Sequence, residues 1–255
     1  MTPLTALAFP TEFDSTWRGF GGMHGGLVVA SMLHAAEAET AATPVTVSAH
    51  FTRPVVPGPV DHQVEVVHGG RTPSVRVSMP GSAGALIRLT RTPSAITWPH
   101  DAPDLGDEDP EVLTPLVIPA DYMPFAQYLD IRPINSARPF AGGADPEFEV
   151  WIRLLSSIDF SPSERAAVLL DALPPGLFAV LDAPVAIPTV EFSAHFPVST
   201  YQQPTVNKYS REGWYHLRHR TVWATEDSCV DETELRTATG HLAGQARQLR
   251  RILTP

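Results

Sequence analysis

Two adjacent glycines early in the chain have a type and position that could do chemistry. Gly25 and Gly26 follow His24 and open an apolar stretch, 24–38, that we predict to be a buried helix. The first backbone N–H groups of a helix have no partner inside it, so they can stabilise an oxygen that gains negative charge. Glycine lets such an oxygen approach closely, because no side chain intervenes. We favour this interpretation over the alternative, a tight turn that only leads into a packed helix.

Two titratable side chains could accompany these amides. His24 titrates near neutral pH and could act as a general base, but a loop or capping role is the simpler interpretation. Asp171 comes shortly before Pro174 and Pro175, which break a predicted helix. We therefore expect Asp171 to cap that broken helix.

Polar residues late in the chain form the second group of candidates. Gln248 belongs to a predicted strand, 241–252, and alternates with small and apolar residues. A buried amide without partners would cost roughly 1–3 kcal/mol, so its presence on such a face favours a functional site over a backbone contact at a strand end. Thr221 lies in another predicted strand, 213–225, where threonine is also an ordinary residue.

Glu191 is a harder case. In the predicted strand 189–197, strict alternation places Glu191 with Ser193 and His195, opposite the apolar residues. A solvated carboxylate on the polar face is the simple interpretation. A bulge or a twisted strand end could instead turn Glu191 toward Gln248.

Other kinds of chemistry find little support in the sequence. His216 and His219 are three residues apart in one strand, on opposite faces, which is wrong for joint metal ligation. There is no phosphate loop in a βαβ context, no Gly-x-Ser-x-Gly elbow and no nucleophilic cysteine motif. Cys229 is the single cysteine, which excludes internal disulfides. These patterns favour neither a metal site, nor a phosphate loop, nor a nucleophilic enzyme motif.

Composition sets wider limits. The formal net charge of −10 argues against nucleic-acid binding, which needs a basic surface. No stretch has the roughly 20 apolar residues of a membrane span, and the start of the chain does not look like a signal peptide, so we expect a soluble, cytoplasmic protein. A local basic pocket for a phosphorylated ligand remains compatible with this charge. Arginine suits phosphate, and four arginines are candidates for such a pocket: Arg53, Arg71, Arg218 and Arg220.

One strand-like phrase occurs twice in the chain. "VTVSAHF" at 45–51 returns as "VEFSAHF" at 190–196, and two weaker matches follow in the same order. Ordered matches at a domain-sized spacing indicate a duplicated module. We predict a first module at 1–95, a Pro- and Asp-rich linker at 96–120 and a second module at 121–255. Each module combines apolar helix with antiparallel strands. "SPSE" at 161–164 predicts the start of the second module's helix with a capping box.

The chain resembles the acyl-CoA thioesterase II-like family, which has a tandem, or double, hotdog fold. The resemblance rests on the order and spacing of several phrases, chiefly "FGGMHGGLVVASMLHA" (20–35), "HFTRPVVPGP" (50–59), "PTVEFSAHF" (188–196) and "GHLAGQARQLRRI" (240–252). It implies an α+β protein in which two curved antiparallel sheets each wrap a central helix. Modules of this family commonly associate, which implies a homo-oligomer.

The resemblance also implies an activity. Family members hydrolyse acyl-CoA thioesters to a free acid and CoA without a cofactor, and an Asp, a Ser or Thr, and a Gln hold the attacking water. These positions fall on Glu191, Thr221 and Gln248, with glutamate in place of the family's aspartate. The amides of Gly25 and Gly26 would then stabilise the oxyanion.

The candidate substrate contacts are His24, Arg53, Arg71 and Arg220. The substrate would be a thioester of CoA or of an acyl carrier protein. Some hotdog enzymes carry an acid on a helix, which makes Asp171 a further candidate. Two alternatives remain: a hotdog hydratase or dehydratase, whose Asp-x-Asn-Pro-x-His type stretch is missing here, and a protein that binds acyl thioesters without turning them over.

Overall fold

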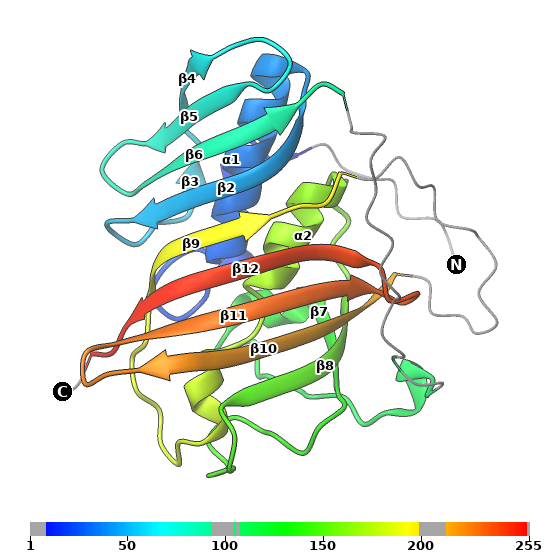
Figure 1. The fold of residues 1–255 in the computed structure, drawn as a ribbon. Coiled ribbons are helices and arrows are strands. Elements are labelled where there is room, and N and C mark those ends of the chain that lie inside the picture. Colours follow the sequence, from blue (N-terminus) through cyan, green and yellow to red (C-terminus); the bar gives the residue numbers. More distant parts are fainter. Residues whose placement is uncertain (1–8, 93–104, 106–107, 199–212, 254–255) are drawn as a thin grey trace.

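The computed structural model describes residues 9–92, 105, 108–198 and 213–253. Its centre is one ten-stranded antiparallel sheet, with the strand order β4-β5-β6-β2-β9-β12-β11-β10-β8-β7. Figure 1 shows that the first half of the chain forms one end of this sheet and the second half the other. The predicted α+β class and the double hotdog arrangement are confirmed, and the sheets of the two halves join edge to edge.

The first half holds one long helix. A short pair of strands, β1 and β3, lies apart from the main sheet. The elements are β1 (Glu12–Phe13), the 3-10 helix η1 (Ser15–Trp17), α1 (Gly25–Thr40), β2 (Thr43–Phe51), β3 (Gly58–Pro59), β4 (Gln63–His68), β5 (Ser74–Met79) and β6 (Ala83–Thr90).

The second half follows after the predicted linker, part of which lies outside the described residues. Its elements are the 3-10 helices η2 (Pro110–Val112) and η3 (Pro124–Tyr128), β7 (Leu129–Pro133), β8 (Glu147–Leu154), α2 (Pro162–Leu170), the 3-10 helix η4 (Gly176–Ala179), β9 (Thr189–His195), β10 (Trp214–Ala224), β11 (Ser228–Thr237) and β12 (Leu242–Arg251).

The repeated phrase forms the junction between the halves. It supplies β2 and β9, which pair antiparallel in the middle of the sheet. Ser48 of the first copy lies directly opposite Ser193 of the second. This register is what an approximate twofold relation between duplicated halves produces, because equivalent residues then meet at the axis.

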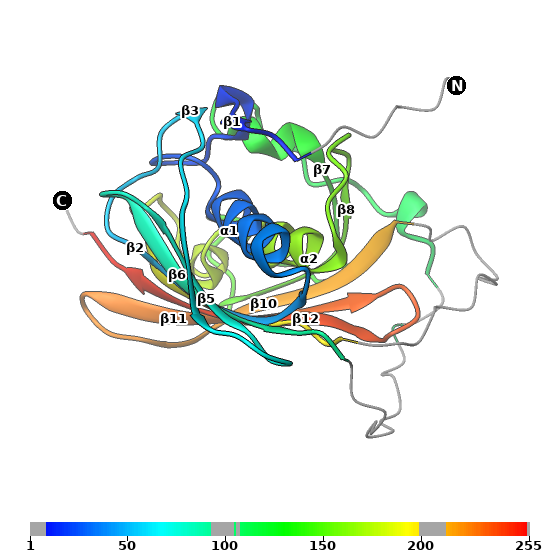
Figure 2. The same cartoon turned by 90° about the horizontal axis from the view of Figure 1, so that it is seen from above.

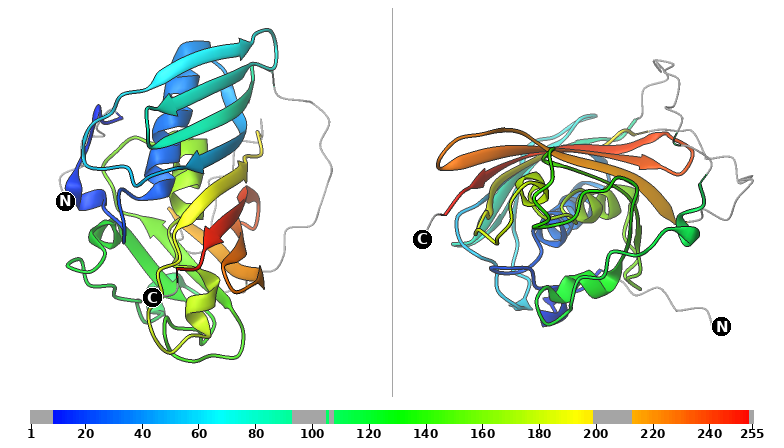
Figure 3. Two further views of the ribbon diagram at one scale, coloured as in Figure 1. Left: turned by 90° about the vertical axis from the view of Figure 1, so that its left-hand side faces the viewer. Right: turned by 90° about the horizontal axis from the view of Figure 1, so that it is seen from below.

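Both helices pack on the same face of the sheet, as seen from above and below in Figures 2 and 3. They run antiparallel, since Gly26 at the start of α1 contacts Ala167 and Val168 near the end of α2, while Glu37 near the end of α1 bonds Ser161 at the start of α2. The sequence explains both positions. α1 is apolar nearly all round and its residues from Gly26 to Leu33 are all buried.

The start of α2 follows the predicted capping chemistry. The Ser161 hydroxyl accepts from the Glu164 N–H, and the Glu164 carboxylate accepts from the Ser161 N–H at 2.8 Å. Pro162 occupies the first turn, where its missing N–H costs nothing. The helix ends at Leu170, and Asp171 is its C-cap residue, as the sequence predicts.

Candidate active site

The site begins where the two helices meet. The last residue of one helix and the first turn of the other lie side by side, because α1 and α2 are antiparallel and closely packed. A Cβ on Gly26 would lie 2.5 Å from the Ala167 carbonyl oxygen, so only glycine permits this approach. It brings the Asp171 carboxylate to the N-terminus of α1.

Asp171 is held by one donor from each half of the chain. Its Oδ2 accepts a hydrogen bond of 2.8 Å from the Gly26 N–H, and its Oδ1 accepts one of 2.7 Å from Gln248 Nε2. These two contacts fix the position of both carboxylate oxygens. The side chain is 12% exposed, so it is held firmly but remains accessible.

A cleft of about 720 Å³ opens over this carboxylate. Most of its wall comes from four regions that are far apart in the sequence, and most of the lining is apolar. These regions are residues 19–25, 51–55, 171–175 and 184–190. Asp171 and Arg250 are the charged side chains inside it, and Arg53 lies at its exposed edge. The arrangement fits an elongated, largely apolar ligand with a polar centre near Asp171.

The glycine amides have different roles. Gly26 N–H is occupied by Asp171, so the expectation that both amides are free for an oxyanion is wrong for Gly26. Gly25 N–H makes no hydrogen bond to any residue that the structure describes. Because Gly25 also lines the cleft, its amide is the donor available to a ligand.

His24 is the N-cap of α1. Its Nδ1 accepts from the Leu27 N–H at 3.1 Å, so the proton lies on Nε2, which donates to the Asp171 carbonyl oxygen at 3.0 Å. Burial lowers the pKa of His24, and this outweighs the nearby Asp171 carboxylate, which lies 3.6 Å from Nε2. A neutral ring with both nitrogens bonded is a capping group, as the sequence favours, and it leaves no lone pair for a general base.

Gln248 is fully buried on the inner face of β12, between Asp171 and Arg250. Thr221 lies on the same face of the sheet, two strands away, but does not touch Gln248. It donates to Asp231 Oδ1 at 2.5 Å. The structure therefore joins Thr221 to the site only through other side chains.

Glu191 is not part of this cluster. It pairs with Leu249 of β12, whereas Gln248 pairs with Phe192, so Glu191 and Gln248 point to opposite faces of the sheet. The pairing does contain an irregularity, but it falls at Val190, before Glu191, and does not turn the carboxylate inward. Glu191 instead accepts a hydrogen bond from Ser193 on the outer face. The expectation that a bulge brings Glu191 to Gln248 is wrong.

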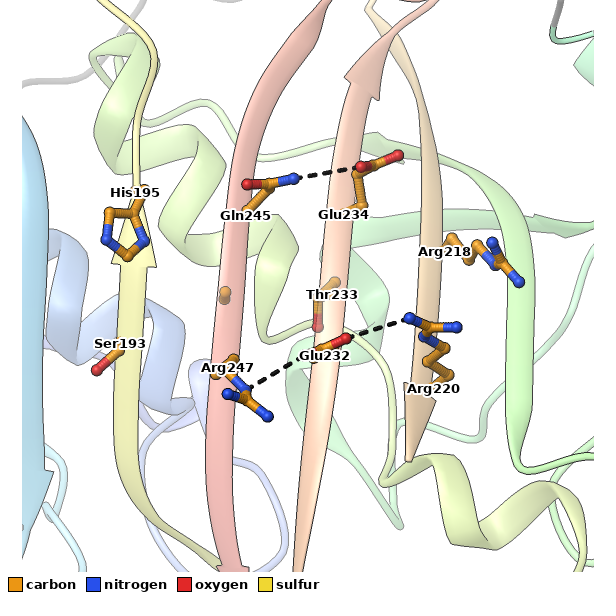
Figure 4. A pocket seen from close by; sticks show the side chains of 10 residues that line it. Ser193, His195, Arg218, Arg220, Glu232, Thr233, Glu234, Gln245 and Arg247 are labelled. Atoms are coloured by element: carbon orange, nitrogen blue, oxygen red, sulfur yellow. Dashed lines mark hydrogen bonds and ion pairs between the residues drawn. The ribbon is translucent and has the colours of Figure 1, made fainter. Parts of the chain in front are cut away.

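The four arginines predicted to form a basic pocket do not lie together in the structure. Arg53 lines the cleft, whereas Arg71 follows the turn after β4 and lies outside it. Arg220 lies on the outer face of the sheet, where it pairs with Glu232 at 3.3 Å. Figure 4 shows it with Arg218 among side chains of both charges that line a pocket on this face. The predicted basic pocket therefore keeps Arg53 but not Arg71, Arg218 or Arg220.

A buried ionic cluster that the sequence reasoning missed lies behind Gln248. Arg250 Nε is 2.6 Å from Asp231 Oδ2, although its N–H does not point directly at that oxygen. His219 Nε2 lies 3.4 Å from the same oxygen. Burial alone would raise the pKa of Asp231, but the charges of Arg250 and His219 hold it well below its usual range. The sequence did contain a signal for this cluster. Arg250 and Gln248 are two residues apart in one strand, so their side chains lie next to each other on the same face.

The described part of the chain shows neither a metal-binding cluster nor a membrane-spanning helix. Within it, no group of three or more His, Cys, Asp and Glu side chains could hold a metal ion. No helix there is long and apolar enough to cross a membrane.

Two known domain families match the chain, one in each half. Residues 13–79 match the acyl-CoA thioesterase N-terminal domain, and residues 99–252 match the acyl-CoA thioesterase C-terminal domain. The chain belongs to the acyl-CoA thioesterase family. The resemblance inferred from the sequence phrases is thereby confirmed.

Solved structures with the same fold have low sequence identity. A hotdog protein of unknown function from Alicyclobacillus acidocaldarius has a TM-score of 0.78 at 21% identity, over 96% of this chain and 92% of its own. A protein assigned as a thioesterase II from Thermobifida fusca has a TM-score of 0.76 at 21% identity, over 95% and 91%. An acyl-CoA thioesterase II from Mycobacterium marinum has a TM-score of 0.65 at 16% identity, over 91% and 89%. No protein of curated function matches the chain.

Proposed function

We propose that this protein hydrolyses an acyl thioester to a free acid and a thiol by direct attack of water, with Asp171 as the activating carboxylate. The single observation that supports this most is the accessible Asp171 side chain, held by Gln248 and Gly26 beside the unoccupied amide of Gly25. In this arrangement, Asp171 as the base and the Gly25 N–H as the oxyanion donor would lie next to each other in one cleft.

The reaction would proceed through a tetrahedral intermediate. Water bonded to Asp171 attacks the thioester carbon and gives its proton to the carboxylate. The carbonyl oxygen becomes negative and receives a hydrogen bond from the Gly25 N–H, aided by the positive end of the α1 dipole. The carbon–sulfur bond then breaks, and Asp171 returns the proton to the leaving sulfur.

The cleft also suggests how the substrate lies. Its apolar walls would bury the acyl chain, and Arg53 at the exposed edge would meet a phosphate of the thiol carrier. Both CoA and an acyl carrier protein bear such a phosphate. A thioester of either is the substrate class that we propose, with the family membership favouring CoA.

The test compares Glu191, the base that the family resemblance implies, with Asp171, the base that we propose from the structure. Free thiol release from a series of acyl-CoA thioesters is measured for the wild type, Asp171→Asn and Glu191→Gln. We expect Asp171→Asn to lose at least a hundredfold in kcat, in line with the usual contribution of a general base, and Glu191→Gln to keep wild-type activity. Thiol release that survives in Asp171→Asn would refute the proposed site. Acyl-CoA binding without release by the wild type would favour the thioester-binding alternative.

A further inference from the structure

The amide of Gln248 lies between two charged groups that dictate its orientation. Nε2 donates to Asp171, and Oε1 accepts from Arg250 Nη2. An ionised carboxylate can only accept hydrogen bonds, and a guanidinium can only donate them. In the reverse orientation, Oε1 would face the carboxylate and the NH2 group would face the guanidinium. Both contacts would then be repulsive.

Arg250 is itself fixed in place. Its side chain is 7% exposed, and its Nε lies beside Asp231, which is completely buried. Asp231 is held in turn by the Thr221 hydroxyl and by His219. A buried ion pair with such partners has one low-energy arrangement, because each charge would be strongly destabilised without the other.

We propose that Arg250 and Asp231 are positioning residues that keep Gln248 Nε2 directed at Asp171. This inference rests on the proposed function, in which Asp171 is the base. Thr221 then belongs to the same chain of contacts and acts through Asp231, rather than by holding the water.

The consequence of losing Arg250 follows from the same contacts. Without a donor at Oε1, the Gln248 amide can rotate and Asp171 loses one of its two N–H donors. The carboxylate is then held less firmly and can turn away from the position of the attacking water. Hydrogen bonds to charged groups are worth about 1.5–3 kcal/mol, which corresponds to a loss of about ten- to a hundredfold in kcat.

The experiment combines Arg250→Met and Gln248→Ala, singly and together, with thiol release as the assay. For Arg250→Met we expect a ten- to hundredfold lower kcat and a nearly unchanged KM. In the Gln248→Ala background, Arg250→Met should cause little further loss, because the group it positions is already gone. The matched control is Arg251→Met, a half-exposed neighbour on the same strand that pairs with Asp227 and should behave as wild type.

A second variant separates positioning from folding. Arg250→Met leaves Asp231 as an unpaired buried charge, whereas Arg250→Met with Asp231→Asn removes both charges, which a folded protein tolerates better. We expect the paired variant to melt close to the wild type and to keep the kinetic defect. The inference would be overturned if Arg250→Met caused the same loss of kcat in the wild-type and Gln248→Ala backgrounds, or if it acted on KM rather than on kcat. If Gln248→Ala or Asp171→Asn proved fully active, the proposed function itself would fail instead.

Discussion

The adjacent glycines at the start of α1 allow a sharp prediction, because a methyl group on each would meet a different neighbour. On Gly26, the Cβ would lie 2.5 Å from the Ala167 carbonyl oxygen and 2.9 Å from Val168 Cα, both in the backbone of α2. On Gly25, it would lie 2.8 Å from Asp171 Oδ2 and 3.5 Å from Phe51 Cζ, which belong to side chains at the cleft. The first change should therefore damage the fold and the second should damage the site.

The magnitude follows from two opposing effects. Forcing a methyl group against backbone atoms costs about 1–3 kcal/mol or more, because the two helices must move apart. Alanine gains back up to about 1 kcal/mol of helix propensity over glycine. We expect Gly26→Ala to lose about 2 kcal/mol net, which lowers the melting temperature of a chain this long by about 4–8 °C.

Gly25→Ala should show the opposite pattern. The Asp171 side chain is partly exposed and can shift, so the free energy of unfolding should change by less than about 1 kcal/mol. The shifted carboxylate and the covered Gly25 amide should lower kcat at least tenfold, on the scale of one lost oxyanion donor or misplaced base.

Urea unfolding and thiol release on the same preparations provide both measurements. A Gly26→Ala protein as stable as the wild type would refute the close helix contact on which the position of Asp171 depends. A fully active Gly25→Ala protein would contradict the proposed oxyanion donor.

Three further predictions concern single side chains. Because burial holds the pKa of His24 below its unfolded value of about 6.5, only the unfolded chain gains this proton as the pH falls through that value. The free energy of unfolding should therefore decrease below about pH 6.5. Urea unfolding between pH 8 and pH 5 should show a smaller decrease for His24→Asn than for the wild type. The same pH dependence in both proteins would contradict this prediction. Burial raises the pKa of Cys229 to about 11, so the native protein should not react with a thiol reagent at pH 8 until it is unfolded. Arg53→Ala should raise KM for CoA thioesters with little change in kcat, and the difference should shrink as salt is added; a difference that salt leaves unchanged would argue against phosphate contact.

Local sequence patterns predicted most of the elements in this fold. Alternation located the strands at 189–197, 213–225 and 241–252, and the capping box at Ser161 located the start of α2, since both depend on residues close together in the chain. The repeated phrase indicated the duplication. Its role as the central strand pair was not predictable, because alternation specifies which face a residue occupies and not which strand lies beside it.

The site shows the same limit. Alternation placed Glu191 on the polar face, and the structure agrees; the position inherited from the family resemblance would have required the opposite face. The interpretation of Asp171 as a helix cap was confirmed but incomplete, because its partners Gly26 and Gln248 are 145 and 77 residues away. One local clue was present: an acidic residue at a helix C-terminus lies against the unfavourable end of that helix's dipole.

That unfavourable end explains why the site needs both halves of the chain. At the C-terminus of α2 alone, the Asp171 carboxylate would be destabilised by the carbonyl groups around it. The antiparallel packing brings the N-terminus of α1 to the same point, and its Gly26 N–H compensates the charge. Gln248, from the last strand of the second half, supplies the other donor. Neither half by itself would place a carboxylate next to an unbonded helix amide, so duplication and helix packing are together the physical origin of the candidate active site.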